Sequence, residues 1–167
     1  GSAPVQANFT AVFNATYAPG TLQARCANGT EWIPDRSATL ATAGAAVALT
    51  ATPDRATIFG TPSDLSYVTI AVVDAAGLTV PDTAGVSVAV SVDGPARLRA
   101  LGSGDPKDPT SFHAGARTAW RGRLVAIVQP IAGATVGTVT LSASALGLAN
   151  ATAVIETVAA RDGLSRK

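Results

Sequence analysis

The chain has 167 residues, of which 47% are hydrophobic and only 5% aromatic, and its formal net charge is +1. This length is enough for one large domain or two small ones with a real core. The basic residues are neither abundant nor clustered, and no phosphate-cradling glycine motif is present, so we expect no nucleic-acid partner. Because no apolar run is long enough to span a bilayer, we also expect no membrane insertion.

The composition itself favours strands. Ala, Val, Thr and Gly supply most of the chain, methionine is absent, and there are only two tryptophans and two tyrosines. β-Branched residues favour strands, and the Gly and Pro residues between them mark turns. The single cysteine, Cys26, can form no disulfide within the chain and no cysteine-based metal site. We therefore predict an all-β protein and expect no cofactor and no metal.

Residues 1–44 offer only about three strands, at Phe9–Phe13, Gly20–Arg25 and Ser37–Thr42. Three strands cannot easily close a sandwich, because two packed sheets need more. We therefore interpret this part as a partial β-sandwich that is incomplete or packs onto its neighbour.

Residues 45–158 alternate apolar and polar side chains with period two, the pattern of half-buried strands. Leu65–Val73 is apolar on both faces, which predicts a central strand. Seven strands in about a hundred residues are typical of an immunoglobulin-like sandwich. We predict an immunoglobulin-like seven-strand β-sandwich preceded by a partial β-sandwich remnant, with residues 159–167 a frayed tail. The seven predicted strands are 46–52, 65–73, 86–92, 96–101, 123–129, 137–144 and 151–157.

All four asparagines of the chain begin an Asn-X-Thr triplet: Asn8, Asn14, Asn28 and Asn150. Such triplets are acceptors for N-glycosylation on exposed loops of secreted proteins. We therefore expect a secreted or extracellular glycoprotein. The alternative is that a threonine-rich bacterial sequence contains these triplets by composition alone.

Trp120 is one of two tryptophans and has Arg117, Arg121 and Arg123 beside it. An aromatic face can stack on the apolar face of a pyranose while arginines bond its hydroxyls, so Trp120, Arg117 and Arg121 are candidate sugar contacts. The alternative is a core or interdomain tryptophan surrounded by solvated arginines. Trp32, in a loop of the first part, has the same two interpretations.

Asp105, Asp108 and His113 belong to the long connection that precedes Trp120. Two aspartates and loop carbonyls could hold Ca²⁺, since hard cations prefer oxygen ligands. The alternative is that Asp105 and Asp108, each followed by or near a proline, shape turns. His113 lacks partners for a zinc site, so we expect it to make a structural hydrogen bond.

Several segments resemble one known family when they are taken together and in order. These segments are Asp64–Asp74, Gly77–Pro81, Gly102–Pro106, Arg117–Gly122 and Leu124–Gln129. The set resembles the C-terminal immunoglobulin-like β-sandwich module of family 2 glycoside hydrolases, the β-galactosidase type. The family loop usually has Asn where Ser103 stands, and Phe is more frequent at the position of Trp120.

Upstream, Tyr17–Ala24 and Ala41–Gly44 resemble the closing strands of the preceding small sandwich in the same enzymes. The resemblance implies that the parent enzyme hydrolyses a terminal glycosidic bond, such as a β-galactoside, with two glutamates of a catalytic barrel outside this chain. A retaining glycosidase needs two carboxyl groups about 5 Å apart. The chain has only two glutamates, Glu31 and Glu156, which we interpret as solvated surface carboxylates, so we assign no catalytic residue.

The resemblance therefore implies a non-catalytic structural or accessory module whose partners are the other domains of the parent enzyme. Two alternatives stay open at this point. A carbohydrate-binding module predicts Trp120 or Trp32 exposed on the surface beside polar groups. An adhesion-type module of a cell-surface glycoprotein would suit the glycosylation triplets.

Overall fold

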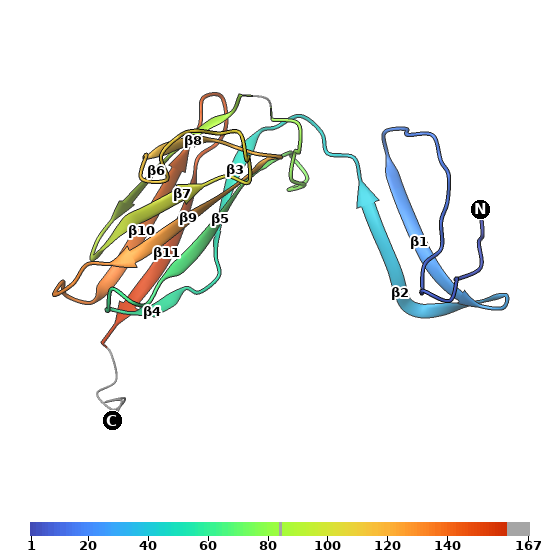
Figure 1. Cartoon of the computed structure of the whole chain (residues 1–167), viewed down its shortest axis with the longest axis horizontal. Helices are drawn as coiled ribbons and strands as arrows, with labels where there is room; N and C mark the ends of the chain where they lie inside the picture. Colours follow the sequence, from blue (N-terminus) through green and yellow to red (C-terminus); the bar gives the residue numbers. More distant parts are fainter. Residues whose placement is uncertain (84, 160–167) are drawn as a thin grey trace. The chain divides into compact units, whose positions relative to one another are not determined.

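The computed structural model describes residues 1–83 and 85–159, and all regular secondary structure in them is β. The chain divides into two compact units, Gly1–Thr42 and Ala43–Lys167 (Figure 1). No helix in the described residues could cross a membrane. Of the predicted tail over 159–167, all but Ala159 lies outside the described residues.

The first unit contains one antiparallel hairpin, of β1 (Thr21–Asn28) and β2 (Glu31–Ala41), with a register shift between Arg25 and Ala27. Gly29 and Thr30 connect the strands, and Gly29 has a φ of 64°. Two of the three predicted strands fall in this hairpin. Both of its strands are exposed along their whole length within the described structure.

The strand predicted at Phe9–Phe13 is wrong. Phe9 has a φ of 60°, a left-handed backbone conformation that a strand cannot contain. The N–H of Phe9 donates to the carbonyl of Gln6 over 2.9 Å, and the N–H of Gln6 donates to the carbonyl of Thr10 over 2.8 Å. Residues 6–10 therefore form a turn, and residues 10–13 have no regular secondary structure, although their apolar residues alternate as in a strand.

The second unit is a β-sandwich of two sheets. The five-stranded sheet has the order β4 (Thr57–Phe59), β11 (Ala151–Val158), β10 (Gly137–Ser144), β6 (Ser87–Asp93) and β8 (Ala116–Thr118). The four-stranded sheet has the order β3 (Ala48–Pro53), β5 (Ser66–Val73), β9 (Arg123–Pro130) and β7 (Ala96–Gly102). Neighbouring strands are antiparallel except β4 and β11, which are parallel.

All seven predicted strands of the sandwich are confirmed, with ends that agree within two residues. β5 lies between β3 and β9, as its apolar residues on both faces predict. The structure adds β4 and β8, which the sequence does not reveal because three residues are too few to show alternation.

The core lies between the two sheets and consists of every second side chain of the paired strands. In β5, Val68, Ile70 and Val72 are at most 1% exposed. The core residues that are completely buried in the other strands are Val88, Leu101, Ala126, Val128, Val139, Leu141 and Ile155. Each buried Val, Leu or Ile side chain contributes about 1.5–3 kcal/mol through its removal from water, so this layer supplies most of the stability of the sandwich.

Candidate functional site

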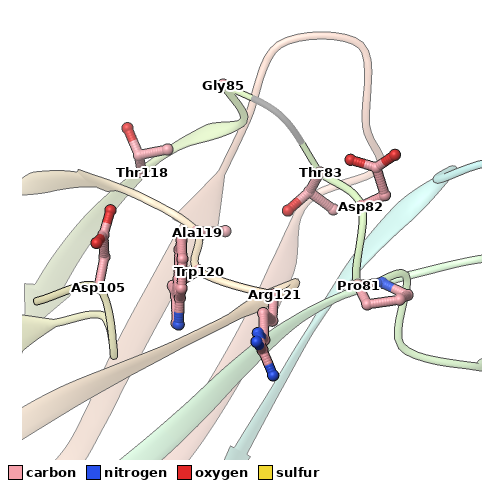
Figure 2. Close-up of a pocket in the computed structure, with 9 residues that line it drawn as sticks. All are labelled: Pro81, Asp82, Thr83, Gly85, Asp105, Thr118, Ala119, Trp120 and Arg121. Carbon is pink, nitrogen blue, oxygen red and sulfur yellow. The ribbon is translucent and has the colours of Figure 1, made fainter. Parts of the chain in front are cut away.

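A hollow of about 300 Å³ lies beside Trp120 on the surface of the sandwich unit. Figure 2 shows the indole edge-on, between Asp105 on one side and Arg121 on the other. The residues that line the hollow come from three separate parts of the chain: Pro81, Asp82, Thr83, Gly85, Asp105, Thr118, Ala119, Trp120 and Arg121. Trp120 is 40% exposed, so part of its ring is available to a ligand.

A tight turn positions Trp120. The backbones of Trp120 and Arg123 exchange two hydrogen bonds, of 3.1 and 3.0 Å, around Arg121 and Gly122. Both turn residues have positive φ, 48° for Arg121 and 73° for Gly122. Two positive φ angles in a two-residue hairpin are the features of a type I′ turn, whose twist matches the flanking strands. Trp120 is therefore held by a two-residue turn with a defined backbone, where the chain passes from β8 of the five-stranded sheet to β9 of the four-stranded sheet.

Gly122 fixes this turn against the four-stranded sheet. The N–H of Val72 in β5 donates to the carbonyl of Gly122 over 2.9 Å. A Cβ at position 122 would lie 2.2 Å from the carbonyl oxygen of Val80, a distance that no side chain could tolerate. Glycine is therefore required here by both backbone conformation and close approach.

Arg117 does not contribute to the surface of the hollow, and we correct its prediction as a sugar contact. Its side chain is only 2% exposed. The guanidinium donates to the carbonyl of Thr110, lies 4.6 Å above the Phe112 ring, and places its Nε 3.5 Å from Oδ2 of Asp108. Arg117 instead holds the connection between β7 and β8, which carries Asp105, against the sandwich.

Asp105 and Asp108 shape turns in this connection. Oδ1 of Asp105 accepts the N–H of Lys107, and Oδ1 of Asp108 accepts the N–H of Thr110, each over 2.9 Å. Hydrogen bonds from the Thr110 hydroxyl and N–H, helped by the charge of Arg117, hold the pKa of Asp108 below its ordinary value. Within residues 1–83 and 85–159, no three His, Cys, Asp or Glu side chains gather as metal ligands would. His113 places Nδ1 3.2 Å from the Arg99 carbonyl, the kind of structural contact that we expected.

Three charged side chains line the hollow: Asp82, Asp105 and Arg121. In the described part of the chain, Asp82 and Arg121 form no ion pair, and the guanidinium carbon of Arg121 lies 5.8 Å from the centre of the Trp120 ring. The sequence singles out Trp120 and Arg121, but it gives no sign of Asp82 or Thr118. Asp82 lies far away in the chain and reaches the hollow only because the segment after β5 packs against the 120–123 turn.

The other candidate residues lie apart from this hollow. Trp32 is 63% exposed on β2, and the guanidinium carbon of Arg25 lies 5.9 Å from its ring centre. Glu31 begins β2, whereas Glu156 lies on β11 and accepts a hydrogen bond from the Thr138 hydroxyl over 2.9 Å. The four asparagines of the glycosylation triplets, Asn8, Asn14, Asn28 and Asn150, are all exposed.

Comparison with known proteins gives the same family as the sequence pattern. Residues 49–154 match glycoside hydrolase family 2 C-terminal domain 5. No curated protein matches the chain.

Solved structures share the fold. A glycosyl hydrolase family 2 member from Bacteroides cellulosilyticus DSM 14838 is 31% identical, with a TM-score of 0.79 over 89% of this chain and 20% of its own. A second member from Bacteroides cellulosilyticus is 30% identical, with a TM-score of 0.78 over 86% of this chain and 18% of its own. A β-glucuronidase from glycoside hydrolase family 2 is 22% identical, with a TM-score of 0.76 over 90% of this chain and 15% of its own, which shows the shared fold alone. The chain thus spans about a fifth of the length of the first two structures, and the match over residues 49–154 shows that it belongs to glycoside hydrolase family 2, as a C-terminal domain of that family.

Proposed function

We propose that this chain serves as a non-catalytic accessory part of a larger family 2 glycosidase. The observation that carries the proposal is that the chain belongs to a C-terminal domain of the family and spans 20% or less of the family 2 structures reported above. A rigid sandwich with a continuous core suits a part that supports a catalytic domain or spaces it from others.

The distribution of carboxylates supports an accessory role. A retaining glycosidase needs two carboxyl groups about 5 Å apart. The two glutamates belong to different units of the described structure, so neither unit pairs them. The aspartates that shape the sandwich accept backbone N–H groups: Asp54, Asp64, Asp74, Asp105 and Asp108.

For the parent enzyme we infer hydrolysis of a terminal glycosidic bond, with β-galactosides as the first substrates to test. The motif pattern of the sandwich supports this choice, since it resembles the β-galactosidase type. One protein of the same fold is a β-glucuronidase, so β-glucuronides are the natural competing substrates.

The decisive experiment compares the purified chain with the full-length parent on chromogenic β-galactosides and β-glucuronides. We expect the chain alone to release no chromophore and the parent to hydrolyse at least one substrate. Removing residues 45–158 from the parent should lower its melting temperature while leaving KM unchanged. Hydrolysis by the chain alone, or a parent without glycosidase activity, would overturn the proposal.

The hairpin unit has a matching role in this proposal: it completes a β-sandwich whose other strands lie in the preceding part of the parent. Large apolar side chains on the hairpin support it, since Leu22 is 65% exposed and Leu40 is 71% exposed. In the full-length parent, residues 21–41 should resist a protease that cuts them in the chain alone. Equal cleavage in both proteins would contradict this role.

We further propose that the parent is secreted and carries sugars on the exposed triplets. The exposure of Asn8, Asn14, Asn28 and Asn150 supports this, because the transferring enzyme requires an accessible asparagine. Expression through a eukaryotic secretory pathway should yield a protein whose mass falls on treatment with a glycan-removing amidase. Asn150→Gln tests the one site that belongs to the sandwich, and an unchanged mass pattern would exclude its use.

A further inference from the structure

We propose that the hollow beside Trp120 binds one neutral pyranose unit, such as the end of a galactoside or glucoside chain. This goes beyond the accessory role, because a domain can support a catalytic barrel without binding sugar. The observations that carry it are the half-exposed aromatic ring, the polar groups on either side of that ring, and the size of the hollow.

The indole of Trp120 supplies a flat aromatic surface, or platform, on which a sugar ring can stack. A pyranose presents a face of C–H groups that packs on an aromatic ring, and a tryptophan offers the largest such ring. The indole is 40% exposed, and Gly104 approaches its five-membered ring so closely that a Cβ at position 104 would lie 3.1 Å from Cδ1. The turn of residues 120–123 fixes the backbone that carries this side chain. A platform that is already in place loses little conformational entropy when a ligand binds.

The groups around the platform match the hydroxyls of a sugar. Asp82 and Asp105 offer carboxylate oxygens that accept O–H groups, and Arg121 offers N–H groups that donate to sugar oxygens. Asp105 uses one oxygen for the N–H of Lys107, which leaves its second oxygen for a ligand. Thr118 adds a hydroxyl that can both donate and accept. Asp105 and Arg121 lie beside opposite faces of the indole (Figure 2), so each can bond the hydroxyls of a pyranose that stacks on its side of the ring.

The size and charge of the hollow narrow the ligand. Its volume of about 300 Å³ is at the lower end of the range for small-molecule sites, so one ring is accommodated and the rest of a glycan extends into solvent. The lining contains two carboxylates, of Asp82 and Asp105, and one guanidinium, of Arg121. A uronic acid would bring a third carboxylate into this group, so a neutral hexose should bind more tightly than a glucuronide.

The test uses the two indole N–H signals of the chain in a nuclear magnetic resonance titration. Trp32 lies on the hairpin unit and serves as an internal control. Addition of methyl β-galactoside or methyl β-glucoside should shift the Trp120 signal to saturation with a Kd of about 1 mM, a typical value for so small a ligand. The Trp32 signal should not move, and methyl β-glucuronide should bind at least about threefold more weakly.

Two variants make the assignment specific. Trp120→Ala should weaken binding at least about tenfold, while Trp32→Ala leaves the Kd unchanged. Asp82→Asn keeps the size of the side chain and removes its charge, so it should weaken binding about threefold or more without altering the melting temperature. This variant keeps the test valid even if Trp120→Ala does not fold.

Three results would overturn the inference. These are a Trp120 signal that no neutral sugar shifts to saturation, equal shifts for Trp32, or unchanged binding by the folded Asp82→Asn and Trp120→Ala variants. Tighter binding of the glucuronide would overturn the choice of a neutral ligand. None of these outcomes touches the accessory role, which the hydrolysis experiment on the parent decides separately.

Discussion

The two units contain the same kind of antiparallel ladder and differ in what covers it. In the hairpin, Leu22 pairs with Leu40, and the two side chains are 65% and 71% exposed. In the sandwich, Leu141 of β10 pairs with Ala153 of β11, and they are 0% and 4% exposed. Strand pairing satisfies backbone hydrogen bonds in both units, but burial requires a second layer. The difference shows that a regular ladder is no measure of how much a segment contributes to stability.

The largest expected effect is a difference in stability loss between the same substitution in the sandwich and in the hairpin. Leu141→Ala should lower the free energy of unfolding by about 2–5 kcal/mol, because it opens a cavity between the sheets. Leu40→Ala, the same substitution on the hairpin, should change it by less than about 0.5 kcal/mol. Urea denaturation of both variants measures the contrast. Similar losses would show that the hairpin is packed as firmly as the sandwich.

A second pair of variants tests the turn that carries Trp120. In Gly122→Ala the added Cβ clashes with the carbonyl oxygen of Val80, and the alanine must also adopt a positive φ. The variant should therefore destabilise the sandwich by about 2–4 kcal/mol. Gly133 has the same φ of 73°, but a Cβ there meets nothing within 4 Å. Gly133→Ala should therefore cost only about 1–2 kcal/mol. Thermal melts that give equal losses would refute the role of close approach at position 122.

A smaller effect depends on pH and concerns Asp74, at the end of β5. Its carboxylate accepts the N–H groups of Gly44, Leu78 and Ala76 over 2.7, 2.9 and 2.9 Å, and these bonds lower its pKa below the ordinary value of 3.8. A lowered pKa means that the stabilisation is complete above about pH 4 and is lost as the pH falls through the lowered value.

The wild-type sandwich should therefore melt at lower temperature as the pH falls below about 4, whereas Asp74→Asn should melt lower at pH 7 and lose less on acidification. Asp93→Asn, at the exposed end of β6, is the matched control and should behave as wild type. Parallel acid profiles for wild type and Asp74→Asn would contradict this assignment.

The smallest expected effect is that of removing the hairpin unit, which tests whether the sandwich is stable without it. Removal of residues 1–42 should leave the melting temperature of the sandwich unchanged within about 2 °C, because its core residues all belong to the second unit. Differential scanning calorimetry of the whole chain and of residues 43–167 provides the measurement. A large drop would mean that the hairpin stabilises the sandwich.

Sequence patterns predict the sandwich well because its strands are long enough to alternate and end at turn residues. β10, for example, has the same bounds in the prediction and the structure. Sequence patterns fail for short strands that form only through pairing with a neighbouring strand. Thr57–Phe59 is a strand because β11 pairs with it, and Ala116–Thr118 is a strand because β6 pairs with it. The alternation at Phe9–Phe13 misleads for the opposite reason, since no strand pairs with it in the described structure.

The candidate site shows the same limit. Trp120 is found from its rarity and Arg121 from its position, and both line the hollow. Arg117 looks equivalent in the sequence, but strand alternation turns its side chain inward while that of Trp120 remains exposed. Asp82 could not be found, since its place depends on how the segment after β5 packs.

The positive φ of Arg121 has a consequence for the stability of this domain. Asn and Gly are the residues that fit the first position of a type I′ turn, and an arginine there lowers stability by about 1 kcal/mol relative to them. Arg121→Asn should thus be an easy route to a more stable sandwich, at the loss of the guanidinium beside Trp120. Position 121 is therefore one at which the residue that best stabilises the turn differs from the residue that places a guanidinium beside Trp120.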